Sequence, residues 1–188
     1  MTQSEDRETK TFFKVFWAWE DEKEEQWLEE QALQGYHLLS VAPFFYEFEK
    51  GPSQQVKYRL DYKVTVDKDY QEYQSLFQDS NWELVTRMSN WHYYRVDLEN
   101  KEVPELYSSN RTKAQKYRRL LAGLFPSIVI LFVVINPTLY RSSSESSGVF
   151  GTIYQIAHIF FILILFFLIY GVIRILTIIR KLESETRE

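Results

Sequence analysis

Cysteine is absent from this 188-residue sequence. Without it the chain has no disulfide framework, no thiolate zinc site and no cysteine nucleophile. The sequence also lacks a nucleophile elbow, a phosphate-binding loop and an H-E-x-x-H zinc pattern. His37 and His92 have no carboxylate or cysteine companions in the sequence around them. We therefore expect no metal and no cofactor, and a non-enzymatic protein, with catalytic residues dispersed along the chain as the alternative.

Basic residues are scarce in the first part of the chain. Residues 1–110 carry 12 Lys and Arg against 22 Asp and Glu, a net charge of −10, whereas the remainder carries 10 against 4, a net charge of +6. An acidic surface repels the phosphates of nucleic acid, so we expect no nucleic-acid partner. The chain is thus predicted to have two unlike parts.

Charged residues are missing from two long apolar runs, residues 120–140 and 153–173, each 21 residues long. A helix needs about 20 such residues to cross the roughly 30 Å of a bilayer's hydrocarbon core. No apolar run follows the first ten residues, so we expect no signal peptide. The sequence predicts a two-helix transmembrane hairpin over residues 118–182, followed by a short tail at 183–188.

Basic residues flank the predicted spans and set their orientation. They are Lys113, Lys116, Arg118 and Arg119 before the first span and Arg174, Arg180 and Lys181 after the second. The connecting segment carries only Arg141. The positive-inside rule then predicts a multi-pass protein of the cell membrane with both termini in the cytoplasm. The same side chains are candidates to contact anionic headgroups, which makes membrane lipids an expected partner.

Two polar residues, Gln155 and His158, lie three apart on one face of the second predicted span. Polar groups inside a membrane are candidates for function, here in a transporter subunit or a membrane enzyme. The alternative is an interhelical hydrogen bond that holds the hairpin together.

The part before the membrane, residues 11–100, alternates strand and helix patterns in an order that occurs twice. Strands are predicted at residues 14–19, 36–41, 44–49, 56–64, 82–88 and 91–98, and helices at 20–34 and 67–80. This order predicts an α+β fold made of a duplicated βαββ unit, close to a ferredoxin-like sandwich. Residues 1–10 are expected to be a flexible N-terminus, and residues 101–117 a linker with a basic juxtamembrane segment.

Matching positions in the two units support the duplication. Pairs separated by 46 positions are Asp21 and Asp67, Trp27 and Tyr73, Gly35 and Asn81, Tyr36 and Trp82, and Leu38 and Leu84. With two extra residues, Tyr46 and Phe48 match Tyr94 and Val96. Asp is a good helix N-cap, and Gly and Asn readily take the left-handed conformation that ends a helix. The alternative is chance similarity between two α/β units with ordinary caps.

The first predicted helix is strongly acidic. Trp27, Leu28 and Ala32 form its apolar face, which leaves Glu22, Glu25 and Glu29 toward water. The acidic run is therefore predicted to be a solvated helix face.

The predicted strand at residues 14–19 carries apolar side chains on both faces, which is typical of a central strand covered on its second side. The cover is the second unit, another copy of the chain, or a partner. Candidate ligand- or partner-binding residues are Trp17, Trp19 and Tyr58, with Arg59 and Asp61 on the polar face of a later strand. The alternative is that the aromatic residues fill the core.

Several segments taken together resemble a bacterial family, the domain of unknown function 2812. They are FWAWEDEKEEQWLEEQALQGYHL, YEFEKG, YRLDY, NWEL and WHYYR, in that order, within residues 12–98. Asn81 stands where the family more usually has glycine. The resemblance implies a domain followed by a membrane hairpin, and a regulatory setting, since members are often encoded near PadR-type transcription repressors. It implies no activity, so no catalytic residues are transferred.

These observations favour a membrane-anchored cytoplasmic interaction or regulatory module with a protein partner or self-association. The alternatives are a small-molecule or lipid sensor with a ligand site on the aromatic sheet, and a subunit of a membrane transporter or membrane enzyme.

Overall fold

The structure is a computed structural model that describes residues 8–66, 68–98, 110–141 and 149–186. The side chains of residues 110–112, 134–141, 149–151 and 154 lie outside this description. The chain divides into two compact units, Met1–Ser108 and Ser109–Glu188. The predicted flexible N-terminus, the linker and the segment between the two spans fall mostly or wholly outside the described residues.

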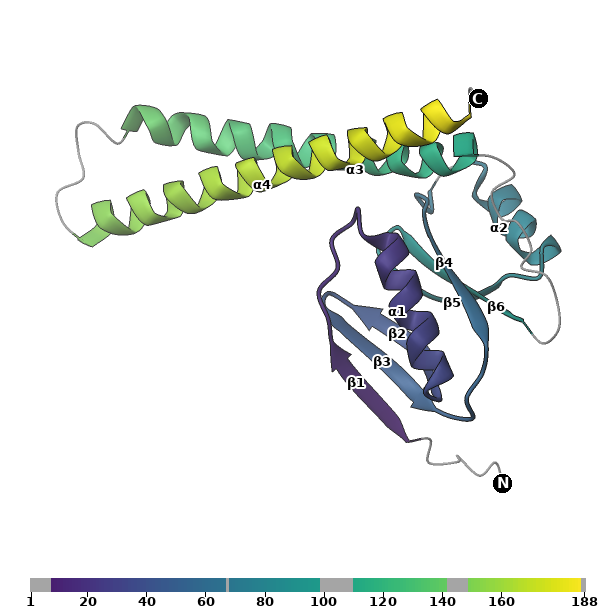
Figure 1. The fold of residues 1–188 in the computed structure, drawn as a ribbon. Coiled ribbons are helices and arrows are strands. Elements are labelled where there is room, and N and C mark those ends of the chain that lie inside the picture. The colour runs from purple at the N-terminus through teal and green to yellow at the C-terminus, as the bar shows by residue number, and fades with distance from the viewer. Residues whose placement is uncertain (1–7, 67, 99–109, 142–148, 187–188) are drawn as a thin grey trace. The chain divides into compact units, whose positions relative to one another are not determined.

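The first unit is a mixed α+β structure with two antiparallel three-stranded sheets (Figure 1). One sheet has the order β1-β3-β2 and the other β4-β6-β5. The elements are β1 (Thr9–Phe13), α1 (Asp21–Leu33), β2 (Tyr36–Ala42), β3 (Phe45–Lys50), β4 (Val56–Tyr62), α2 (Tyr70–Asp79), β5 (Glu83–Met88) and β6 (Trp91–Asp97). The α+β class is confirmed, but two separate sheets do not confirm a duplicated ferredoxin-like topology.

The β2–β3 and β5–β6 hairpins share one register. Leu38 pairs with Phe48 and Leu84 pairs with Tyr94, and in each hairpin the register shifts directly after the leucine. Such a shift is a β-bulge or irregularity of the ladder. Phe48 therefore corresponds to Tyr94 at the same 46-residue spacing, and not to Val96 as the alignment with two extra residues predicted.

The first strand differs from the prediction. It is β1, Thr9–Phe13, and it lies at the edge of its sheet, so the central strand predicted at residues 14–19 is wrong. The last ladder contact is the Lys14 N–H donating to the Phe44 carbonyl at 2.9 Å. The chain then turns, with the Glu20 N–H donating to the Trp17 carbonyl at 2.7 Å. The apolar side chains of this segment belong to a turn ahead of α1, which is why they do not alternate between two faces of a sheet.

The C-terminal ends of α1 and α2 agree with the predicted capping residues, whereas the N-terminal end of α1 does not. Gly35, with φ +82°, and Asn81, with φ 60°, take the left-handed conformation after α1 and α2, as predicted. Asp21 is the first residue of α1 and Glu20 occupies the N-cap position, so the predicted N-cap role of Asp21 is wrong, and Asp67, its counterpart in the second unit, lies outside the described residues.

Two clusters of buried residues stabilise the first unit. The larger cluster joins α1 to both sheets and contains Leu28, Ala32, Leu38, Tyr46, Phe48, Val56, Tyr58, Leu60 and Tyr93. The smaller joins α2 to the other face of the second sheet and contains Tyr73, Phe77, Trp82, Tyr94 and Val96. The second sheet is thus covered on both faces, and its aromatic residues mainly fill the core.

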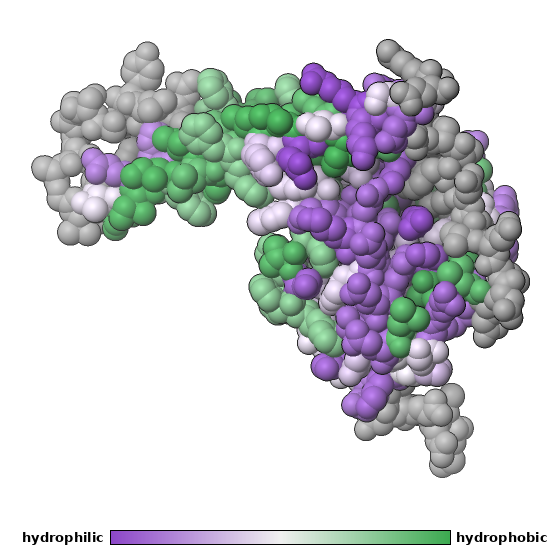
Figure 2. All heavy atoms as spheres, viewed as in Figure 1, coloured by the Kyte–Doolittle hydropathy of each residue, from purple (hydrophilic) through white to green (hydrophobic). Residues whose placement is uncertain are grey.

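The second unit consists of α3 (Asn110–Arg141) and α4 (Val149–Glu185), which contact each other (Figure 1). Over the described residues, one helix is long and apolar enough to cross a membrane, Gln155–Glu185, and its most apolar 18-residue stretch has a mean hydropathy of 2.9. Only 11% of its most apolar stretch is buried, unlike the core helix of a soluble protein. Figure 2 shows this apolar surface in green, with polar residues toward the C-terminal end of α4. The span predicted at residues 120–140 lies in α3, and the two-helix hairpin is not confirmed.

Candidate ligand-binding site

The acidic face of α1 lies along the free edge of β4, so the predicted solvated face is wrong for two of its three residues. Glu25 accepts a hydrogen bond from the Leu60 N–H at 2.8 Å and another from the Arg59 guanidinium at 3.0 Å. Glu29 accepts from the Lys57 ammonium at 2.6 Å. Glu22 is exposed, as predicted.

These contacts satisfy the edge of a sheet. β4 is the outer strand of its sheet, and the outward N–H groups of an edge strand need partners when they are covered. Glu29 also accepts from the Tyr58 N–H at 3.3 Å. Two carboxylates one helical turn apart thus meet two N–H groups two residues apart on the strand. The Glu25 and Glu29 carboxylates thus stabilise the packing of α1 against β4.

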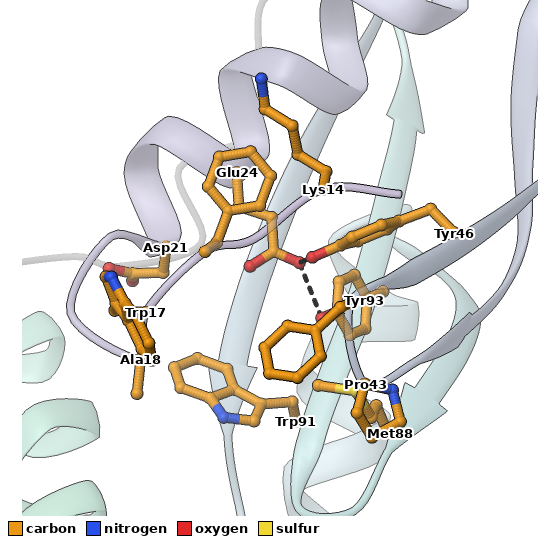
Figure 3. Close-up of a pocket in the computed structure, with 12 residues that line it drawn as sticks. Lys14, Trp17, Ala18, Asp21, Glu24, Pro43, Tyr46, Met88, Trp91 and Tyr93 are labelled. Atoms are coloured by element: carbon orange, nitrogen blue, oxygen red, sulfur yellow. Dashed lines mark hydrogen bonds between the residues drawn. The ribbon is translucent and has the colours of Figure 1, made fainter. Parts of the chain in front are cut away.

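A pocket of about 210 Å³ opens between the two sheets within the first unit (Figure 3). It is framed by the turn ahead of α1, the first turn of α1, and the two hairpin turns of the sheets. Its lining residues are Lys14, Phe16, Trp17, Ala18, Asp21, Glu24, Pro43, Phe44, Tyr46, Met88, Trp91 and Tyr93. Aromatic side chains make up half of this set, and two carboxylates lie among them.

Glu24 is the central polar residue of the pocket. One of its carboxylate oxygens accepts hydrogen bonds from the Tyr46 and Tyr93 hydroxyls, each at 2.8 Å, while the other points away from them (Figure 3). Only 7% of Glu24 is exposed. This burial raises the pKa of the carboxyl above its ordinary value, the two tyrosine hydrogen bonds oppose the rise, and the negative charge of Asp21 adds to it.

The two tyrosines are tuned by the same contact. Burial, and then the neighbouring Glu24 charge, raise the pKa of both Tyr46 and Tyr93 above the ordinary range, so both hydroxyls stay protonated and donate. Tyr46 comes from β3 of the first sheet and Tyr93 from β6 of the second. One carboxylate therefore ties the two sheets together at the base of the pocket.

The aromatic wall contains a strained residue. Phe44 has φ 70°, a conformation that bulky side chains rarely adopt, and it holds an exposed ring at the mouth of the pocket. Trp17 stacks on Trp19 with ring centroids 6.0 Å apart, and Trp91 packs edge-on against Tyr62 at 5.4 Å. Rings outside the pocket thus fix the orientation of the rings that line it.

The predicted binding residues are dispersed in the structure. Trp17 lines the pocket and Trp19 stacks behind it. Tyr58 is fully buried in the core, Arg59 pairs with Glu25 across the β4 edge, and Asp61 is buried on the face of β4 that α2 covers. The structure does not bring these five side chains together into one site.

Sequence reasoning missed the central group of the pocket. Glu24 was one acidic residue in an acidic run, and no local pattern separates it from its neighbours. Tyr46 and Tyr93 come from different sheets, and pairing them with Glu24 requires the tertiary fold.

A second polar cluster surrounds His92 under α2. Its Nε2 lies 2.8 Å from the Tyr70 hydroxyl and its Nδ1 lies 3.1 Å from the Asn90 carbonyl. Burial lowers the pKa of His92 below its ordinary value, so it is neutral at physiological pH. Within the described residues, no three His, Cys, Asp or Glu side chains gather closely enough to hold a metal ion.

The predicted membrane-surface and intramembrane residues all lie in the second unit. Arg118, Arg174, Arg180 and Lys181 are exposed, Lys113 and Arg119 are half-buried, and Lys116 is buried. The Lys116 ammonium lies 5.1 Å from the Tyr117 ring centroid, which is a cation–π contact.

On α4, Gln155 is exposed and His158 is half-buried. His158 Nε2 is buried and has no hydrogen-bond partner among the described atoms.

Comparisons with known proteins give one match. Neither the curated proteins nor the solved structures contain a match to this chain. A family model described as "Protein of unknown function (DUF2812)" matches residues 20–130, which is more than half of the chain and includes α1, both hairpins and the carboxylates of the pocket. The chain therefore belongs to the DUF2812 family.

Proposed function

We propose that this protein is a non-enzymatic, membrane-anchored module that binds a small molecule in the pocket between its two sheets. The observation that carries the proposal is the buried Glu24 carboxylate, held by two tyrosine hydroxyls at the base of an aromatic pocket. Concave, mainly apolar pockets with a few convergent polar groups and a perturbed pKa are the usual form of ligand sites.

The two sheets that frame the pocket are proposed to be duplicated βαββ units. The shared 46-residue spacing, the matching bulges and the same strand order in each sheet support this proposal. A ligand bound in a pocket between two repeats contacts both of them, so binding would change how one repeat packs against the other. This would let a regulatory module report its ligand to a partner.

Binding is tested by the thermal unfolding of the full-length protein in lipid nanodiscs. All five tryptophans lie between residues 17 and 91, so tryptophan fluorescence follows the first unit alone. A ligand that binds only the folded state raises Tm. We expect metabolites of one chemical class to raise Tm of the wild type but not of Ala18→Phe, which fills the pocket. If no compound does so across amines, acids, lipids and cell-wall precursors, the proposal fails.

The membrane anchor is proposed to be a two-span hairpin of a bacterial cell membrane, with both termini in the cytoplasm. Support comes from the apolar, mostly unburied α4 and from the excess of Lys and Arg outside the connecting segment. Because the chain has no cysteine, single substitutions act as unique labels. An impermeant maleimide should label Ser144→Cys on intact cells and spare Gln26→Cys until the cells are opened. The reverse pattern would contradict this topology.

A protein partner is the second candidate function, and one surface favours it. Phe13 and Phe45 pair across β1 and β3 with ring centroids 5.4 Å apart, and they are 65% and 50% exposed. Phe13 lies on the edge strand β1 beside the exposed Phe44, and an added strand or a second copy of the chain could pair with this edge. The double substitution Phe13→Ser and Phe45→Ser should abolish crosslinking to the partner in cells and leave the free energy of unfolding within about 1 kcal/mol of the wild-type value. Unchanged crosslinking would remove this surface from consideration.

A further inference from the structure

The polar side of the pocket carries negative charge. Asp21 and Glu24, one helical turn apart at the start of α1, are only 1% and 7% exposed. Lys14 is the one cation among the residues that line the pocket, and it is exposed. Its ammonium lies 5.9 Å from the Phe16 ring centroid and is directed away from the Glu24 carboxylate (Figure 3).

The apolar side of the pocket consists of ring faces and edges. Six aromatic residues line it: Phe16, Trp17, Phe44, Tyr46, Trp91 and Tyr93. Ring faces attract cations and repel anions, and tryptophan does so most strongly. The Lys14 ammonium near the Phe16 ring is an instance of this attraction at the edge of the same pocket.

The charge state of Glu24 favours a ligand of the opposite sign. Its carboxyl is already hydrogen-bonded by two tyrosines, and burial still raises its pKa. An anionic ligand would add a third negative charge beside Asp21, and a neutral ligand would bury the carboxylate further without compensation. A cation would stabilise the ionised carboxylate and would also contact the rings.

Building on the proposed ligand-binding function, we infer that the pocket binds a small organic ammonium ion, with the ammonium beside Asp21 and Glu24 and the apolar part against the aromatic wall. The volume of about 210 Å³ limits the size of this ligand. An engineered cavity of about 150 Å³ in another protein holds benzene. The pocket therefore suits an amine of roughly the size of benzylamine.

Three compounds of nearly equal shape separate charge from size: benzylamine, benzyl alcohol and benzoate. Each is titrated into the full-length protein in nanodiscs of neutral lipid at pH 8, and binding is followed by tryptophan fluorescence, since Trp17 and Trp91 line the pocket. We expect benzylamine to bind at least ten-fold more tightly than benzyl alcohol, and benzoate not to bind. Glu24→Gln should reduce benzylamine affinity about ten-fold and leave benzyl alcohol unchanged. Glu30→Gln, an exposed change on the same helix, should alter neither.

The wild type also gives a test that needs no variant. Asp21 on α1, Tyr46 on β3 and Tyr93 on β6 are the titratable groups that face Glu24, and Lys14, before the helix, lines the same pocket with its ammonium directed away from Glu24. Because the Glu24 pKa is raised above its ordinary value of about 4.5, benzylamine affinity should increase as pH rises above that value and Glu24 loses its proton, and benzyl alcohol affinity should stay constant.

Two results would overturn the inference in distinguishable ways. If benzyl alcohol or benzoate binds as tightly as benzylamine, and Ala18→Phe removes that binding, the pocket is a ligand site but not one for ammonium ions. If none of the three binds, the ammonium inference fails, and the thermal screen with its wider set of compounds decides the proposed function.

Discussion

The substitution Glu25→Ala tests whether the acidic helix serves packing. In the folded protein the Leu60 N–H of the edge strand β4 donates to Glu25 at 2.8 Å, and this contact is buried. Alanine removes this acceptor while α1 still covers the N–H. A solvated helix face, as the sequence predicted, would tolerate the change.

The magnitude follows from two contacts. A buried N–H that loses its partner costs about 1–3 kcal/mol. The Arg59–Glu25 ion pair contributes about 1 kcal/mol at most, because the Arg59 side chain is 32% exposed and screened by water. We expect the free energy of unfolding to fall by about 1–4 kcal/mol. With a urea slope of about 2 kcal/mol per M, the midpoint should fall by about 0.5–2 M.

The assay is urea unfolding of the full-length protein in nanodiscs, followed by tryptophan fluorescence. Glu25→Gln retains an oxygen acceptor for the Leu60 N–H and should lose only about 1 kcal/mol. Glu30→Ala removes the same charge and gains the same helix propensity at an exposed position, so it should lie within about 0.5 kcal/mol of the wild type. If Glu25→Ala behaved like Glu30→Ala, the reasoning about the β4 edge would be refuted.

Three further changes test other parts of the fold. Gly35→Ala should lower the free energy of unfolding by about 1–3 kcal/mol in the same urea assay, because φ is +82° and a Cβ would lie 2.5 Å from the Gly51 carbonyl oxygen. Asn81→Gly should have little effect, because glycine readily adopts the φ of 60° found there. The folded-state pKa of Glu24 is raised, so the folded protein binds its proton more tightly, and stability should fall as pH rises above about 4.5; Glu24→Gln should flatten this slope. The folded-state pKa of His92 is lowered, so stability should fall as pH drops below about 6.5, and an unchanged slope in His92→Gln would contradict that assignment.

Local patterns were sufficient to predict most elements of the first unit. Alternation and turn residues located five of the six strands, and the conformational freedom of Gly35 and Asn81 located both helix ends. These features depend on neighbours in sequence. The strand predicted at residues 14–19 failed because its apolar side chains were assigned to sheet faces, although they pack in a turn.

Long-range contacts account for what could not be predicted. Glu24, Glu25 and Glu29 look alike in sequence, yet one binds two tyrosine hydroxyls and two cover a strand edge. Their roles depend on α1 lying between two sheets, and one sequence alone does not reveal that placement. Of the five predicted binding residues, only Trp17 therefore lines the candidate pocket.

Native mass spectrometry of the full-length protein, released gently from its own membranes, tests the central claim most directly. We expect the wild type to retain one small molecule per chain, and Ala18→Phe, with unchanged near-ultraviolet circular dichroism, to retain none. A wild type without any added mass, or an equal added mass on both proteins, would contradict a ligand site between the two sheets.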